Sequence, residues 1–256
     1  MKAYEASFDL RATPLLPVIA RLDGKNFHNF TKGLNRPFDV RLSNCMTELT
    51  KFLVEETQAI IGYTQSDEIT LVYHSLDLKS QIYFDGRINK MVSILSAMAT
   101  LKFNQLIALS IPEKSKLNPL FDCRVFQVAN REEAINCLLW RQIDALKNAI
   151  SMAAQHYYSH KELHQKTGKE KQEMLFKKGI NFNNYPTFFK RGSFVLRRTK
   201  KTKFSCEELE KLPLKHEARA NPDLKVLRSI SEVVELPPLS KISNKEGVLF
   251  LGENPI

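Results

Sequence analysis

Two stretches decide the fold of this chain: PVIARLDG at residues 17–24 and TQSDEITLVY at residues 64–73. The first is a short apolar run that ends in Asp23 and Gly24, which is typical of a buried strand followed by a turn. The second begins with polar turn residues and continues as a β-rich run. Together with residues 60–63 it predicts a hairpin.

Two amphipathic helices are expected around these strands. Asp39 is a suitable N-cap for a helix whose apolar residues recur every three or four positions through Leu53. A second apolar stripe runs from Ile88 to Ala99, and residues 123–128 predict one more strand. The order β-α-β-β-α-β predicts an α+β fold, with a ferredoxin-type antiparallel sheet and helices on one face.

This topology places two carboxylates at one sheet edge. The first strand lies beside the third and antiparallel to it, so Asp23 and Asp67 should be neighbours in space. A carboxylate pair next to Gly24 can bind two Mg²⁺ ions that leave positions for substrate phosphates. Two such metals favour phosphoryl transfer, including nucleotidyl transfer. The alternative is that both aspartates only serve their turns.

The second half of the chain carries most of the positive charge. The net charge is +10, and most of the excess lies after residue 160, with an acid-free basic run over residues 190–203. Such an excess favours a nucleic acid partner over a merely solubilising role. We expect a catalytic core at 1–135 and a helical, basic extension at 136–256, which begins with a long helix over 134–155.

The four cysteines have no C-x-x-C spacing, so we expect a reducing compartment, the cytoplasm, with the cysteines as ordinary core residues. The start of the chain has no apolar leader, and the weakly polar stretch over residues 91–101 is shorter than a bilayer span, so no membrane partner is expected.

Two further features need an interpretation. His156, His160 and His164 recur at a spacing that would place them on one helix face, where adjacent pairs can bind zinc. No H-E-x-x-H pattern or nearby cysteine accompanies them, which favours a polar helix face. Trp140 is interpreted as a core anchor.

Several motifs in this order resemble the histidine tRNA guanylyltransferase superfamily, whose members extend RNA in the 3'-to-5' direction. They are RLDGKNFHNF at 21–30, YTQSDE at 63–68, FDCRV at 121–125, WRQ at 140–142 with Asp144, INFNN at 180–184 and KRG at 190–192. The resemblance implies a polymerase-like palm, two Mg²⁺ ions, ATP, GTP or other nucleoside triphosphates as substrates, tRNA as partner, and a homotetramer.

The resemblance also implies roles for individual residues. Asp23, Asp67 and Glu68 would be catalytic, with Asp23, Asp67 and the Gly24 carbonyl as metal ligands and Glu68 balancing charge or orienting its neighbours. The nucleotide site would comprise Asp23, Gly24, Lys25, Asn26, Phe27, His28, Ser66, Asp67, Arg87 and Lys90. The topology opposes the last two, because it starts the second helix at the sheet edge opposite Asp67. From the basic run, tRNA would be bound by Lys190, Arg191, Arg197, Arg198, Lys200 and Lys201.

One position departs from the family pattern and indicates which branch of the family this chain resembles. Members dedicated to histidine tRNA carry a histidine where this chain has Leu146. This resembles the branch that repairs truncated tRNA 5' ends by templated addition, after activation of a 5' monophosphate by ATP. Three alternatives stay open: a dedicated histidine tRNA guanylyltransferase, a non-catalytic tRNA-binding protein, and a nucleotide cyclase of similar palm topology.

Overall fold

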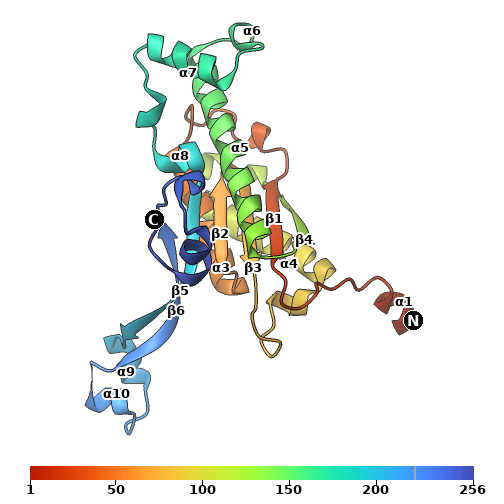
Figure 1. Ribbon diagram of the computed structural model, residues 1–256, viewed down its shortest axis with the longest axis vertical. Coiled ribbons are helices and arrows are strands. Elements are labelled where there is room, and N and C mark those ends of the chain that lie inside the picture. Colours follow the sequence, from red (N-terminus) through yellow and green to blue (C-terminus); the bar gives the residue numbers. More distant parts are fainter. Residues whose placement is uncertain (222) are drawn as a thin grey trace.

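A computed structural model describes residues 1–221 and 223–256 and contains a six-stranded antiparallel sheet in the order β4-β1-β3-β2-β5-β6 (Figure 1). This confirms the predicted α+β class. The strands are β1 (Val18–Gly24), β2 (Ile61–Gln65), β3 (Glu68–Tyr73), β4 (Phe121–Gln127), β5 (Ser193–Lys203) and β6 (Lys225–Val234). Strand β1 lies between β4 and β3, as the ferredoxin-type order requires.

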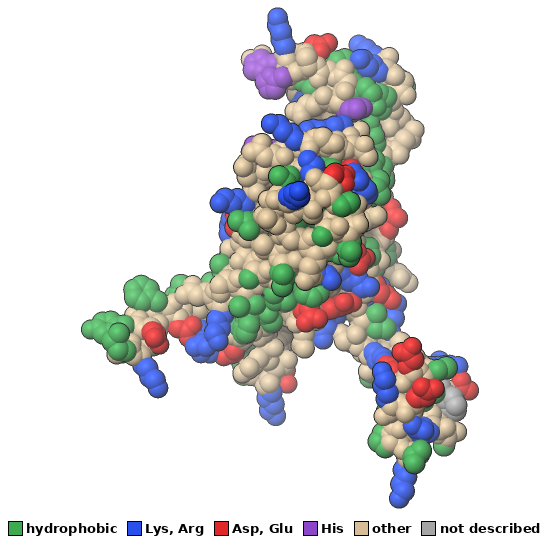
Figure 2. All heavy atoms as spheres, turned by 180° about the vertical axis from the view of Figure 1, so that it is seen from behind, with side chains coloured by type: hydrophobic (Ala, Val, Ile, Leu, Met, Phe, Trp, Pro, Cys, Tyr) green, Lys and Arg blue, Asp and Glu red, His purple; other side chains and the backbone are tan. Residues whose placement is uncertain are grey.

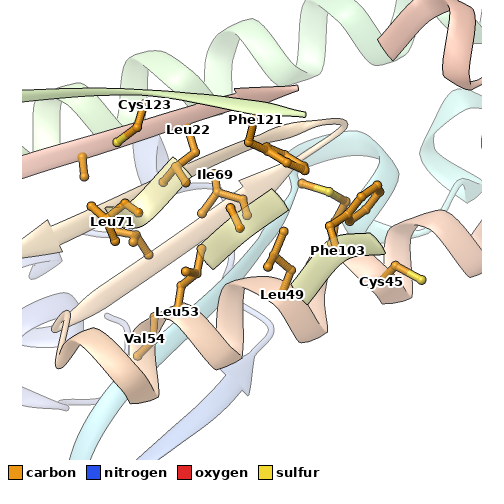
Figure 3. Packing of buried hydrophobic residues seen from close by; sticks show 14 of the residues in the cluster. Leu22, Cys45, Leu49, Leu53, Val54, Ile69, Leu71, Phe103, Phe121 and Cys123 are labelled. Carbon is orange, nitrogen blue, oxygen red and sulfur yellow. The ribbon is translucent and has the colours of Figure 1, made fainter. Parts of the chain in front are cut away.

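The two expected helices, α3 (Val40–Thr57) and α4 (Ile88–Ser110), cover one face of the sheet. The carboxylate of Asp39 caps α3 by accepting a hydrogen bond from the backbone N–H of Arg41 over 3.0 Å. Leu22 and Leu71 point from the sheet toward Leu49 of α3 and Phe103 of α4, and all four are fully buried (Figure 3). This apolar layer fixes the ends of β1 and β3 relative to each other.

The opposite face is partly covered by α5 (Arg131–Tyr157), which crosses in front of the strands in Figure 1. Its buried residues Ala134, Ile135 and Leu138 pack in one cluster with Ile19 of β1 and Tyr63 of β2. The C-terminal residues Leu239, Ile242, Val248 and Leu249 complete this second core. Side chains on β1 and β3 that point to this face therefore meet α5.

The predicted basic extension contributes to the same sheet. Strand β5 pairs with β2, and β5 and β6 then continue beyond the body as a two-stranded arm with α9 (Cys206–Lys211) and α10 (Glu217–Ala220) at its tip (Figure 1). Helices α6 (His160–Leu163) and α7 (Gly168–Lys177) lie at the far end of α5. The remaining short helices are α1 (Lys2–Ala6), α2 (Phe27–Phe30) and α8 (Thr187–Arg191).

Helix α4 is predominantly apolar, although it carries Lys90 and Lys102. By length and composition it is the one helix among the described residues that could cross a membrane, and it is longer than the apolar stretch the sequence suggested. Five of its residues, Met91, Leu95, Ala99, Phe103 and Ile107, form a buried stripe against the sheet. Such a stripe is typical of a core helix, which passes the same compositional test.

Candidate active site

The C-terminal end of β1 and the N-terminal end of β3 lie side by side, as the topology predicts, and they form the end of the sheet that is called the edge here. Asp23 lies opposite Glu68 in the β1–β3 ladder, and the backbone N–H of Gly24 donates a hydrogen bond to the Asp67 carbonyl over 3.1 Å. The turn before β3 has Ser66 at a φ of 50°, and the Ser66 hydroxyl donates to Asp67 Oδ1 over 3.0 Å. The structure therefore brings Asp23 and Asp67 together.

The electrostatics of this edge favour a cation. Burial raises the pKa of Asp67 above its usual value, and the nearby charge of Asp23 raises it further, while the Ser66 hydrogen bond opposes the rise. Two carboxylates that repel each other beside an open cavity fit Mg²⁺, which binds few carboxylates and completes its shell with water and phosphate oxygens. The described residues hold no cluster of three or more His, Cys, Asp or Glu side chains suited to a metal, so a cation here would rely on this pair and on oxygens from water or substrate.

A cavity of about 680 Å³ opens at this edge, which is large enough for a nucleotide. Asp23, Gly24, Asp67 and Glu68 line one part of it. The walls include Asn26 and Ser66 from the loops, His28 from α2, Asn148, Ser151 and Gln155 from α5, and the aromatic side chains of Phe38, Phe188 and Phe189. The exposed His28 lines the same cavity as Asp23 and Asp67.

Position 24 requires glycine because the backbone passes close to the Phe27 ring. A Cβ atom at this position would come within 2.3 Å of the Phe27 ring. That ring is buried and packs against Phe30, Phe103 and Phe121, with ring centroids 5.1–5.5 Å apart. Phe27 lines the cavity, as expected, and it also anchors the loop after β1 against the core.

Glu68 forms a buried ion pair that the sequence analysis missed. Arg141 donates from Nε to Glu68 Oε1 over 2.5 Å and from Nη2 to Oε2 over 2.6 Å. Arg141 Nη2 also donates to Asp144 Oδ2 over 3.2 Å, and Asn148 donates to the same oxygen over 3.4 Å. Burial raises the pKa of Glu68, and Arg141 opposes that rise. The signal was present in the WRQ motif with Asp144, but the pairing with a distant strand could not be derived from it.

Three expected nucleotide contacts lie elsewhere. Lys25 is exposed and is not among the residues that line the cavity. Arg87 and Lys90 line a separate hollow of about 560 Å³. Arg87 Nη2 donates there to Asp9 Oδ2 over 2.9 Å. The ring of Tyr83, just before α4, stacks on that of Tyr73 at the end of β3, so α4 starts at the end of the sheet opposite Asp67, as the topology indicated.

The basic residues expected to bind tRNA lie on α8 and β5. They differ in whether their charged groups already have a partner within the protein. Lys190 Nζ donates to the Asn183 carbonyl over 2.6 Å, and Lys200 Nζ forms an ion pair with Glu232 at 2.5 Å. The Nε atoms of Arg191 and Arg198 are buried without a hydrogen-bond partner in the described chain. Arg197 donates to the Gln58 carbonyl over 3.0 Å, and Lys201 is exposed.

Two interpretations are wrong. The three histidines do not share one helix, because α5 ends at Tyr157 and Ser159 starts α6 with a capping box to Glu162. Trp140 is 59% exposed and is not a core anchor. The Arg141 guanidinium lies 4.8 Å from the centre of its ring. The adjacent face of α5, rather than Trp140 itself, faces the core.

Comparison with family models gives two matches in chain order. A model described as "tRNAHis guanylyltransferase" matches residues 1–129, and one described as "Thg1 C terminal domain" matches residues 133–235. The first includes Asp23, Asp67 and Glu68, and the second includes Arg141 and the basic run.

Similar proteins agree with these models. The tRNA(His) guanylyltransferase of Saccharomyces cerevisiae is 31% identical over 72% of this chain and 84% of its own length. An uncharacterized protein of Acanthamoeba polyphaga mimivirus is 30% identical over 79% of this chain and 77% of its own length.

Three solved structures have a fold similar to that of this chain. A bacterial tRNA(His) guanylyltransferase (Thg1)-like protein in complex with ATP has a TM-score of 0.77 and 34% identity, covering 97% of this chain and 95% of that one. A second structure with the same description, in complex with GTP, has a TM-score of 0.71 and 31% identity, covering 94% of this chain and 92% of that one. The enzyme of Saccharomyces cerevisiae has a TM-score of 0.66 and 29% identity over 77% and 93%.

Proposed function

Because this chain belongs to the tRNAHis guanylyltransferase (Thg1) family of nucleotidyltransferases, we propose that it adds nucleotides to the 5' end of truncated tRNA. Addition runs in the 3'-to-5' direction and is templated by the opposing acceptor strand. The observation that carries this proposal is the pair Asp23 and Asp67 at the mouth of a nucleotide-sized cavity.

Each part of the site has a proposed task. Asp23, Asp67 and the Gly24 carbonyl would hold two Mg²⁺ ions, which stabilise the attacking and leaving oxygens of an in-line displacement at phosphorus. The cavity binds ATP when a 5' monophosphate needs activation, and GTP or another nucleoside triphosphate is added. Ser66 and His28 line the cavity beside the aspartates, where Ser66 can donate to a phosphate oxygen and His28 can contact the activated 5' end.

One observation favours the repair branch over the dedicated histidine tRNA enzyme: Leu146 stands where the family resemblance places the histidine of the dedicated branch. It is 38% exposed and does not line the cavity, so the replacement alters the outer surface of α5 rather than the nucleotide site.

The two regions of the chain divide this work. We propose that residues 1–135 supply the catalytic core and that residues 136–256 supply the cavity wall on α5 and the surface that faces tRNA. We also propose a cytoplasmic homotetramer. Cys45 and Cys123 are buried, as the sequence predicts, but Cys206 is exposed and is therefore not a core residue. In Figure 2, hydrophobic side chains gather on the body between the N-terminal segment and the arm, where a second copy could dock.

The test uses a 5'-truncated tRNA with a labelled end, Mg²⁺, and all four nucleoside triphosphates. Two substrates differ only in the strand opposite the missing nucleotides. Additions that change with that strand support a templated repair enzyme. One guanylate added to histidine tRNA alone, whatever the opposing base, supports the dedicated enzyme instead. Binding without addition to any tRNA supports the non-catalytic protein. Asp23→Asn serves as the inactive control.

A further inference from the structure

We propose that Arg141 is a positioning residue: it holds the Glu68 carboxylate away from the cations and thereby reserves them for Asp23 and Asp67. The inference rests on the proposed function, because it assumes that cations bind at this edge. It assigns a role to Arg141, which lies outside the motifs that contain Asp23, Asp67 and Glu68. It also changes the expected role of Glu68, from a catalytic group to a carboxylate that Arg141 keeps in place.

Glu68 lies within reach of the cations, but both of its carboxylate oxygens are held by Arg141. Glu68 follows Asp67 directly and faces Asp23 across the ladder, so its carboxylate could reach the same cations. Both of its oxygens accept hydrogen bonds from Arg141, at 2.5 and 2.6 Å, in a bidentate arrangement. The two side chains are each only 11% exposed. A carboxylate held in this way has less freedom to turn toward a metal.

Arg141 is itself held in place. Asp144 accepts a hydrogen bond from Arg141, and Asn148 donates to Asp144 one turn further along α5. The neighbouring Gln142 accepts the backbone N–H of Leu239 over 2.8 Å, which ties this turn of α5 to the C-terminal segment. Arg141 and Asn148 both line the cavity. A chain of contacts therefore runs from β3 to the cavity wall.

A purely structural ion pair would respond differently to the removal of Arg141. If Arg141 only stabilised the fold, its removal would lower stability, and cation binding would weaken with it. If Arg141 restrains Glu68, its removal instead frees a carboxylate beside Asp23 and Asp67. Cation affinity then rises while the geometry for catalysis is lost, because affinity follows the number of charged ligands.

The experiment measures Mn²⁺ binding to the nucleotide-free protein by electron paramagnetic resonance, together with the melting temperature and the kcat and KM of nucleotide addition. The variants are Arg141→Met, Arg141→Lys, Glu68→Gln and the double variant Arg141→Met/Glu68→Gln. The matched control is Arg131→Met, which removes an arginine of the same helix whose partner, Glu246 at 2.8 Å, lies outside the cavity.

For Arg141→Met we expect Mn²⁺ affinity about threefold higher or more, since Glu68 adds a ligand charge, and kcat lower by about 10- to 100-fold, as for other residues that orient a metal site. The KM for ATP should change little. Arg141→Lys should retain part of the kcat, because it keeps the charge but loses the bidentate geometry.

The double variant decides the question. It leaves no unpaired buried charge, so it should fold even if Arg141→Met does not. We expect its Mn²⁺ affinity to return to that of the unaltered protein and its kcat to exceed that of Arg141→Met. Equal loss of kcat in the single and double variants, or Mn²⁺ affinity that falls in Arg141→Met, would overturn the inference. The Mn²⁺ measurement needs no tRNA, so it distinguishes this failure from a failure of the proposed reaction.

Discussion

The backbone N–H of Gly24 donates a hydrogen bond to the carbonyl oxygen of Asp67 over 3.1 Å, and this bond joins the end of β1 to the turn before β3. The aspartate side chains of the two segments are thus held at one edge by backbone geometry. Their mutual repulsion and the burial of Asp67 work against them. The arrangement therefore costs the folded protein stability, and bound cations would offset that cost.

The first prediction concerns this cost. Asp67→Asn should abolish nucleotide addition, because it removes an anionic ligand of the cations, yet it should not lower the melting temperature in the absence of Mg²⁺. The reason is that the variant removes a buried charge next to another carboxylate. Added Mg²⁺ should raise the melting temperature of the unaltered protein and leave that of Asp67→Asn nearly unchanged. Thermal denaturation with and without Mg²⁺ makes both comparisons, and retained addition activity would contradict the metal assignment.

The second prediction concerns Gly24. Gly24→Ala should destabilise the protein by about 1–3 kcal/mol, a typical cost of overpacking, because the added Cβ would come within 2.3 Å of the Phe27 ring. Urea denaturation measures the change. Gly168→Ala is the control, since its Cβ meets only the Ile150 Cδ1 atom at 4.0 Å and lies in the first turn of α7. Similar stabilities of both variants would show that the loop after β1 adapts easily.

The third prediction concerns thiol reactivity and pH. Burial raises the pKa of Cys123 to about 12, whereas Cys206 is exposed. Iodoacetamide at pH 8 should therefore modify Cys206 and leave Cys123 unmodified, as mass spectrometry of peptides would show. Above pH of about 8.5 the unfolded chain loses thiol protons that native Cys123 keeps, so the free energy of unfolding should fall as pH rises. Modification of all four cysteines in guanidinium is the control.

Local patterns predicted the core and the edge, because both depend on signals that lie close together in sequence. The apolar run before Asp23 and the helical spacing after Asp39 each specify one element, and the order of elements then places Asp23 beside Asp67. The same reasoning placed Arg87 at the opposite edge, although the family resemblance suggested a nucleotide contact.

Long-range pairing was not predictable in this way. Nothing near Arg141 indicates that its partner is Glu68 on another element, and the burial of both groups follows only from α5 packing across the sheet. The exposure of Trp140 has the same cause, since the face of α5 that meets the sheet is the one with Leu138 and Arg141. The break after Tyr157 depends on the Ser159 capping box, a local signal that the histidine spacing obscured.

The last prediction concerns the arm, on which Lys, Arg, Asp and Glu side chains are intermixed (Figure 2). Lys200 is already paired with Glu232, whereas Lys201 is exposed, with no ion pair among the described residues. If the arm contacts tRNA phosphates, Lys201→Gln should weaken binding and reduce the slope of log affinity against log salt by about 1. Lys200→Gln should have a smaller effect, because part of its charge is neutralised within the arm.

Glu232→Gln is the informative counterpart, because it frees Lys200 without adding a base. It should tighten tRNA binding and steepen the salt dependence, whereas a purely structural ion pair would only loosen the arm. Filter binding at several salt concentrations, with Asp23→Asn to prevent turnover, measures all three variants. Equal slopes in all of them would place the arm outside the tRNA interface and move the phosphate contacts to Lys190 and Arg191 at the base of β5.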